Sequence, residues 1–126
     1  MPIPAQGGTI TIGGIYNGSE DEFIYDFEDG TTQGWTIFQG SNSDSPDSWM
    51  HCTNYTTDNF TLGYGHNGSN GFMLSESLID NSMPVHPDNY LVSPQILLGG
   101  SISFWATNLD VEYGAEHFEV MVSTEG

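Results

Sequence analysis

Residues 87–94 read PDNYLVSP, and together with residues 101–105 (SISFW) and residues 117–123 (HFEVMVS) they decide the fold class. The first run passes from a polar opening into apolar residues, and the other two alternate apolar and polar side chains at the two-residue period of half-buried strands. Glycines at 99 and 100 favour a turn between the first two runs. We therefore expect three strands here, and strands and loops upstream that pack against them.

The rest of the chain continues in the same style, with short strand-forming runs between turn residues. We expect further strands at residues 9–12 (an edge strand), 23–28, 35–38 and 72–74. Residues 16–22 read as a polar connector with a turn at Asn17-Gly18, and residues 77–83 as one helical turn that Pro84 ends. With 16 glycines and no amphipathic helix, the pattern predicts an all-β jelly-roll sandwich of antiparallel strands with long loops.

The length of 126 residues suits one domain with a single core. We divide the chain into a flexible or edge-strand segment, residues 1–22, and a β-sandwich domain, residues 23–126. No apolar run approaches the roughly 20 residues of a membrane span. Cys52 is the single cysteine, so no disulfide forms within the chain.

The charge balance is the strongest compositional feature, with 17 Asp and Glu, no Lys or Arg, and a formal net charge of −17. Nucleic acid and anionic membranes are disfavoured as partners, because neither can be neutralised without basic side chains. A bound cation, or simple solubility, explains the acidity equally well. The 37% hydrophobic and 13% aromatic content argues against a disordered acidic tail.

The absence of Lys and Arg also makes the chain resistant to proteases that cleave after basic residues. Two explanations remain open: a protein that lives among such proteases, or a resistant fragment of a longer protein.

The best metal candidate is the acidic turn of Asp26, Glu28 and Asp29, which follows a predicted strand. Calcium takes six to eight oxygen ligands, and carboxylates on a turn can converge with backbone carbonyls. The competing interpretation is a solvated acidic turn. Asp44 and Asp47 lack an EF-hand pattern and favour a plain polar loop.

Aromatic residues in loops are the best candidates for ligand contact. Trp35 and Trp105 lie on apolar strand faces and are expected in the core. The loop candidates are Trp49, Tyr55, Tyr64 and Tyr113. No nucleophile motif is present, His51 and Cys52 lack a zinc spacing and read as a surface His beside a buried thiol, and we expect no catalysis.

Four motifs in order, Phe27-Glu28, Gly34-Trp35, residues 88–91 (DNYL) and residues 117–123, give the chain a family resemblance. It resembles the cleaved-adhesin domains, the haemagglutinin/adhesin modules of gingipain-type proteases. The resemblance implies a noncatalytic jelly roll with structural calcium, for which Glu28 ranks first. It also implies a secreted or cell-surface location, and attachment to host or matrix proteins, haem proteins or glycans.

The family pattern continues beyond the position of Glu125, so we expect the sandwich to be incomplete without a further C-terminal segment, from the same parent protein or a neighbouring subunit. The loop after the Trp strand also departs from the family, with SDSPD at residues 43–47 in place of an Asp-x-Asp-Gly run. Two alternatives stay open: a carbohydrate-binding module of a secreted hydrolase, and a structural subunit of an extracellular filament.

Overall fold

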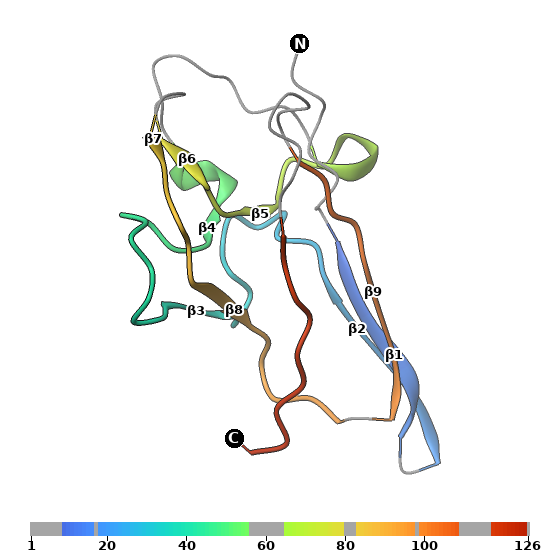
Figure 1. Ribbon diagram of the computed structural model, residues 1–126. Coiled ribbons are helices and arrows are strands. Elements are labelled where there is room, and N and C mark those ends of the chain that lie inside the picture. Colours follow the sequence, from blue (N-terminus) through green and yellow to red (C-terminus); the bar gives the residue numbers. More distant parts are fainter. Residues whose placement is uncertain are drawn as a thin grey trace.

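The computed structural model of the protein describes residues 9–16, 18–55, 65–79, 83–97, 99–108 and 117–125. Within these ranges the regular structure consists of short strands and two 3-10 helices (Figure 1). In chain order they are β1 (Ile10–Tyr16), β2 (Ser19–Tyr25), β3 (Thr36–Gln39), β4 (Met50–His51), η1 (Cys52–Asn54), η2 (His66–Gly68), β5 (Met73–Leu74), β6 (Leu78–Ile79), β7 (Met83–Pro84), β8 (Asn89–Val92) and β9 (Gly100–Phe104).

β1 is the central strand of an antiparallel three-stranded sheet with the order β2-β1-β9. Ile12 pairs with Phe23 on one side and with Ile102 on the other. Because side chains alternate along a strand, most of the apolar residues of the three strands share one face, which we call the inner face, while Ile15 and Ile24 lie on the other. The inner face consists of Ile10, Ile12, Phe23, Tyr25, Ile102 and Phe104.

This sheet corrects two sequence predictions. The strand expected at residues 9–12 is a central strand and not an edge strand, because β9 returns to pair along its other side. The polar connector expected at residues 16–22 is instead part of a hairpin, in which Tyr16 pairs with Ser19. Gly18, with a φ of +83°, lies in the tight turn of this hairpin, where a positive φ favours glycine.

β3 and β8 form a two-stranded antiparallel sheet, so the strand predicted in PDNYLVSP is confirmed. Ile37 pairs with Leu91, and both pack against the cluster that contains Trp35. Phe38 pairs with Tyr90 on the opposite face, where the two rings stack with centroids 4.6 Å apart. Each face of this small sheet therefore carries one cross-strand apolar or aromatic pair.

Two shorter antiparallel pairs complete the sheets, β4 with β5 and β6 with β7. The strand predicted at residues 72–74 is confirmed as β5. The helical turn predicted at residues 77–83 is wrong, since Leu78 pairs with Pro84 and Ile79 with Met83 as two strands. Ile79 favours strand structure whereas Leu78 favours helix, so here the pairing partner decides the local structure.

The core divides into two adjoining clusters. The larger contains Phe27, Trp35 and Met73, against which residues of β1, β2, β3 and β8 pack. The smaller contains Phe72 and Leu74 and includes Cys52 and Tyr55 at its margin. Trp35 makes edge-to-face contacts with Tyr25 and Phe27, so its prediction as a core residue is confirmed.

Residues 117–123 depart from the prediction of a half-buried strand. All of them are exposed, with Phe118 at 58% and Val122 at 70%, and within the described ranges no strand pairs with them. Trp105, expected in the core, is likewise 52% exposed. Alternation in the sequence gives a propensity for strand structure, but a strand also needs a neighbour.

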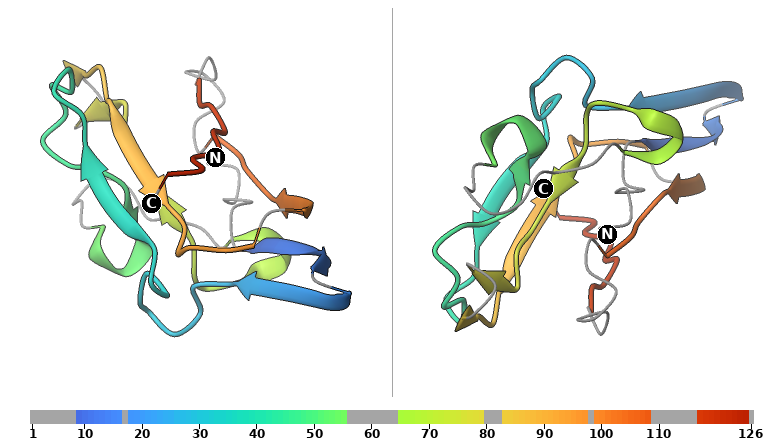
Figure 2. Two further views of the ribbon diagram at one scale, coloured as in Figure 1. Left: turned by 90° about the horizontal axis from the view of Figure 1, so that it is seen from below. Right: turned by 90° about the horizontal axis from the view of Figure 1, so that it is seen from above.

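The β class and the antiparallel pairing are confirmed, and the jelly roll stays a prediction, because the described residues form several small sheets. Figures 1 and 2 show the three-stranded sheet and the β3–β8 pair on two sides of the molecule, with residues 117–125 running between them. No helix in the described part of the chain is long and apolar enough to cross a membrane.

Candidate functional site

The acidic turn lies between β2 and β3, and its first carboxylate is held by a glutamine. Asp26 Oδ1 accepts hydrogen bonds from Gln33 Nε2 at 2.9 Å and from the Glu28 backbone N–H at 3.2 Å. These bonds favour the ionised carboxylate and lower the pKa of Asp26, with the Gln33 side chain as the largest cause. Gln33 Oε1 in turn accepts the N–H of Phe27 at 3.1 Å, which fixes the amide between the two.

Asp29 is bound within the turn itself. Its Oδ1 accepts the backbone N–H of Thr31 at 2.9 Å and the Thr31 hydroxyl at 2.8 Å, an arrangement typical of Asx turns. The same bonds lower the pKa of Asp29, led by the backbone N–H. The turn thus supplies its own donors to both aspartates.

Glu28 contacts a different part of the chain. Its Oε1 accepts the backbone N–H of Gly71 at 2.8 Å, across 43 residues of sequence. The two backbones approach closely, because a Cβ on Gly71 would overlap the carbonyl group of Phe27 and lie 2.8 Å from the Glu28 nitrogen. Position 71 therefore accepts only glycine without movement of the main chain.

Phe27 joins these contacts to the core. It is fully buried and has a φ of +58°, which is uncommon for a residue with a large side chain. His51, only 2% exposed, binds the carbonyl of Phe27. The Thr53 N–H donates to His51 Nδ1 at 3.2 Å, so His51 Nε2 carries the ring hydrogen. This N–H donates to the Phe27 oxygen at 2.7 Å. We call Phe27, Glu28, Gln33, His51 and Gly71 the Phe27 node.

The Phe27 node corrects the expectation for His51 and Cys52. His51 is the buried member of the pair, and Cys52 is half-buried with its thiol donating to the carbonyl of Asn70 at 3.1 Å. Apart from the Phe27-Glu28 motif, no local pattern indicates the node, because His51 lies 24 residues from Phe27 and Gly71 lies 43 residues from Glu28 along the chain.

For metal binding, the turn offers carboxylate, hydroxyl and amide oxygens, which is the donor chemistry that calcium prefers. The three carboxylates are adjacent in sequence, but Glu28 is directed to Gly71 while Asp26 and Asp29 bind donors of the turn. Within the described residues, no group of three or more His, Cys, Asp and Glu side chains converges as a metal set. Calcium binding at the turn stays a prediction.

The second acidic loop is occupied by protein donors. Asp44 accepts the backbone N–H of His86, and its Oδ2 lies 3.2 Å from His86 Nδ1. The backbone bond is the largest cause of a lowered pKa at Asp44. This arrangement agrees with the plain polar loop that the sequence favoured there.

The aromatic candidates lie in different settings. Trp49 is half-buried, packs against the larger core cluster and donates from Nε1 to the Asn89 carbonyl at 3.3 Å. Tyr55 is half-buried beside the smaller cluster. Tyr64 and Tyr113 lie outside the described residues. Their role in ligand contact stays a prediction.

The sequence missed the aromatic surface at Trp105. This exposed ring stacks on His66 of η2, with centroids 3.7 Å apart and planes 11° apart. Trp105 ends the strand-like run of residues 101–105, which led to its placement in the core. A flat, half-exposed indole is a common contact surface for proteins and for sugars.

Comparison with known proteins places the chain in a family. The model of the Cleaved Adhesin Domain matches residues 22–126. Hemagglutinin A of Porphyromonas gingivalis is 32% identical over 105 residues, which is 80% of this chain and 4% of that protein. Lys-gingipain W83 of the same organism is 32% identical over 80% of this chain and 6% of its own length, and Gingipain R1 is 42% identical over 65 residues. No solved structure matches. The chain therefore belongs to the cleaved adhesin domain family.

Proposed function

We propose that this chain is a noncatalytic adhesion module of a secreted or surface-displayed bacterial protein, and that it binds host or matrix proteins or glycans. The observation that carries the proposal is the family match over residues 22–126, with a hemagglutinin among the relatives. The chain spans 4% of that relative, so the module would act as a small part of a larger protein.

The contacts of His51 and Cys52 support a noncatalytic role. Both ring nitrogens of His51 are engaged, by Thr53 and by the Phe27 carbonyl, so this imidazole is not free to act as a base. The neighbouring Cys52 thiol donates to the Asn70 carbonyl at 3.1 Å. The ring nitrogen beside it, His51 Nδ1 at 3.8 Å, already accepts the Thr53 N–H and does not activate the thiol.

Adhesion can be tested directly with the folded chain. We expect it to bind purified extracellular matrix proteins or members of a glycan array, and to cleave none of them. A chain that binds neither class would refute the proposal, and turnover of a peptide or glycoside substrate would refute its noncatalytic part.

Structural calcium is the second part of the proposal. The bonds from Gln33 and Glu28 to Asp26, and those from Thr31 to Asp29, all go to Oδ1, so the second carboxylate oxygen of each could take part in binding a cation. A bound divalent cation also reduces the repulsion among acidic side chains. Its contribution to stability is therefore larger in a chain with a net charge of −17 and no Lys or Arg than in a chain with balanced charges.

The calcium test is a thermal melt with and without chelator. At a calcium concentration about 100 times Kd, binding would add about 2.7 kcal/mol to the free energy of unfolding. We expect Asp26→Asn and Asp29→Asn to abolish the chelator effect, and Asp21→Asn on β2 to keep it. Glu28→Gln should also weaken it, while lowering stability in chelator through the lost bond to Gly71. A wild-type melt that chelator leaves unchanged would remove calcium from the proposal.

A carbohydrate-binding module is the second candidate, and the exposed Trp105 ring is the observation that favours it. Indole faces stack on sugar rings, and one face of Trp105 already rests on His66. If glycans are the ligand, Trp105→Ala should abolish glycan binding without unfolding the chain. Retained binding to a matrix protein in this variant would favour protein adhesion.

A further inference from the structure

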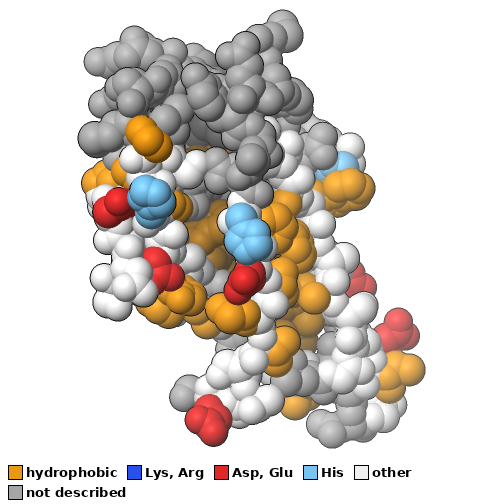
Figure 3. All heavy atoms as spheres, viewed as in Figure 1, with side chains coloured by type: hydrophobic (Ala, Val, Ile, Leu, Met, Phe, Trp, Pro, Cys, Tyr) orange, Lys and Arg blue, Asp and Glu red, His pale blue; other side chains and the backbone are white. Residues whose placement is uncertain are grey.

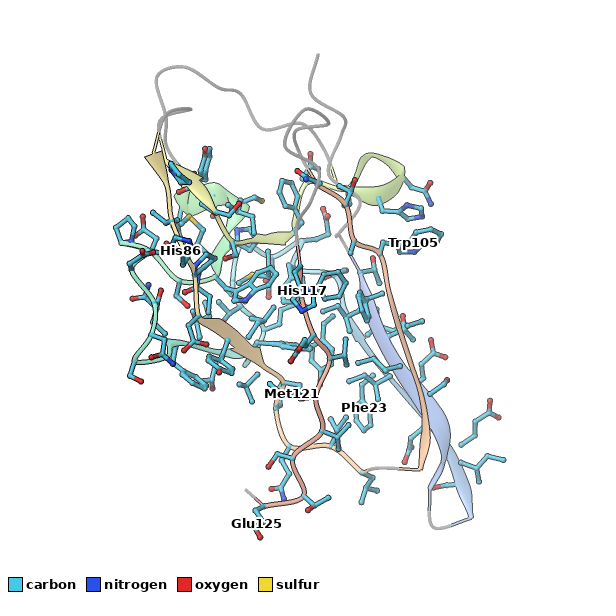
Figure 4. The ribbon with its side chains drawn as sticks, viewed as in Figure 1. Phe23, His86, Trp105, His117, Met121 and Glu125 are labelled. Carbon is cyan, nitrogen blue, oxygen red and sulfur yellow. The ribbon has the colours of Figure 1, made fainter. Side chains whose placement is uncertain are left out.

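The stacked rings of Trp105 and His66 lie apart from the segment of residues 117–123. The ring centroids are 3.7 Å apart and the planes differ by 11°, so the imidazole covers one face of the indole. Trp105 is 52% exposed, and this exposure belongs to the other face and the ring edges. Figure 4 shows Trp105 at the edge of the molecule, away from His117 and Met121. The pair is therefore not at the place where we expect a further segment to complete the sandwich.

Ring stacking, and not charge, joins the two side chains. Among the described histidines, ion pairs with carboxylates are made by His86 and His117 and not by His66. Figure 3 shows a histidine next to a hydrophobic side chain at this edge of the molecule, with the acidic side chains of this view farther away. The exposed indole face therefore lies in uncharged surroundings.

His66 projects from a turn that its own backbone closes. The N–H of Gly65 donates to Ser69 O at 2.7 Å, and the N–H of Gly68 donates to Gly65 O at 3.0 Å. Asn67, with a φ of +55°, takes the left-handed conformation that asparagine tolerates in turns. The imidazole is therefore held by a fixed support.

A fixed ring beneath Trp105 favours binding on the opposite face of the indole. A ligand that must immobilise a free side chain loses affinity, whereas a side chain that is already held adds no such cost. Stacking on His66 holds the plane of the indole before a ligand arrives. The exposed face is a flat π surface without charge, and it suits the C–H face of an uncharged sugar ring.

We propose that His66 is the positioning residue of a glycan site on Trp105, and that this site takes one uncharged hexose ring on the indole face opposite His66. The inference rests on the proposed adhesion function and on its glycan candidate. It adds a second residue and a class of sugar to that candidate. His66 acts through Trp105 and does not itself touch the sugar.

The test is a nuclear magnetic resonance titration of the full chain with methyl β-galactoside, methyl β-glucoside and methyl α-mannoside. Each of the three tryptophans gives one indole N–H signal, and the signal lost in Trp105→Ala identifies that of Trp105. We expect at least one sugar to shift this signal to saturation. The other two signals should stay in place, because Trp35 is buried and the Trp49 N–H donates to the Asn89 carbonyl. If no sugar shifts the Trp105 signal, or all three signals shift equally, the proposal is overturned.

Variants at position 66 test the positioning role. His66→Ala removes the ring beneath the indole, so the sugar should bind about three- to tenfold more weakly while circular dichroism stays unchanged. His66→Phe keeps a flat ring and should restore binding. His86→Ala, at an exposed histidine elsewhere, is the matched control and should bind as wild type. Equal affinity of wild type and His66→Ala would overturn the role of His66.

A pH titration gives a signature that a merely structural role would not produce. Histidine side chains gain a proton between about pH 8 and pH 5, and a cation over an indole face interacts with its π system. The indole N–H signal of Trp105 should therefore move with pH in wild type and stay in place in His66→Phe. A Trp105 signal that behaves alike in the two proteins would contradict the stack and overturn the proposal.

A solid-phase assay separates this inference from the adhesion proposal. If wild type binds matrix proteins but none of the three sugars, the inference fails and the adhesion proposal stands. If wild type binds no matrix protein and no member of a glycan array, the adhesion proposal fails, and the titrations with the three sugars alone then decide the inference.

Discussion

Substituting Gly71 by alanine probes the Phe27 node directly. The added Cβ would overlap the carbonyl group of Phe27 and lie 2.8 Å from the nitrogen of Glu28, and both groups are main chain that cannot rotate away. Relief requires the 26–29 backbone to separate from residue 71. That separation also stretches the 2.8 Å bond from the Gly71 N–H to Glu28 and disturbs the bond from His51 to Phe27.

The expected cost combines two effects. Overpacking against a fixed neighbour costs about 1–3 kcal/mol, and weakening a hydrogen bond to a partly exposed carboxylate adds about 1 kcal/mol. We therefore expect Gly71→Ala to lower the free energy of unfolding by about 2–4 kcal/mol in urea titrations. The titration should be followed by circular dichroism, with the slope in urea compared between variants.

Gly13→Ala is the matched control. Its Cβ would meet Glu22 Cγ at 3.7 Å and a backbone oxygen at 3.8 Å, which are ordinary contacts. We expect its unfolding free energy to change by less than about 1 kcal/mol. If the two alanine variants have equal stability, the close approach at Gly71 does not hold the turn, and the reasoning on the Phe27 node is wrong.

Two further predictions concern acid stability and the tryptophans. Asp26 has a lowered pKa in the folded chain, so its stabilisation is present above the unfolded value of 3.8 and is lost as pH falls through the folded value. Asp26→Asn should therefore lose stability relative to wild type at about pH 7, and the difference should shrink at about pH 2.5; a difference that persists in acid would contradict this. Trp35→Ala should cost about 3–5 kcal/mol because the ring is buried. Trp105→Ala should cost less than about 1 kcal/mol because its ring is 52% exposed, and equal losses in urea titrations would contradict the placement of the two rings.

The strands that the sequence predicted well are those whose pattern and partner agree. In residues 87–94 the polar opening, the apolar centre and the flanking prolines bound a four-residue strand, and β3 pairs with all of it. Trp35 follows the same logic, because it precedes β3 and belongs to the core cluster against which residues of β1, β2, β3 and β8 pack. The periodicity of the sequence therefore predicts a strand or a core residue correctly where neighbouring strands pack against it.

Residues 117–123 and the Phe27 node were beyond such reasoning for different physical reasons. Alternation in residues 117–123 predicts a strand. Whether its side chains are buried depends on which elements of the fold lie beside it, and the spacing of residues in the sequence does not specify those neighbours. The positive φ of Phe27 is set by tertiary contacts with His51 and Gly71, and local preference disfavours it. Similarly, the sequence places Asp26, Glu28 and Asp29 on one turn, but the direction of the Glu28 side chain depends on Gly71, which lies 43 residues away along the chain.

The Phe27 node has a consequence for how this family can vary. The peptide unit between Phe27 and Glu28 accepts a hydrogen bond from the His51 ring and lies against the main chain of Gly71. A substitution at any of these positions therefore changes the effect on stability of a substitution at the others. Their effects on the free energy of unfolding should be non-additive. Once Gly71→Ala has separated the two backbones and broken the bond from the Gly71 N–H to Glu28, Glu28→Gln should cause little further loss. Homologous sequences should therefore exchange these residues together and seldom singly.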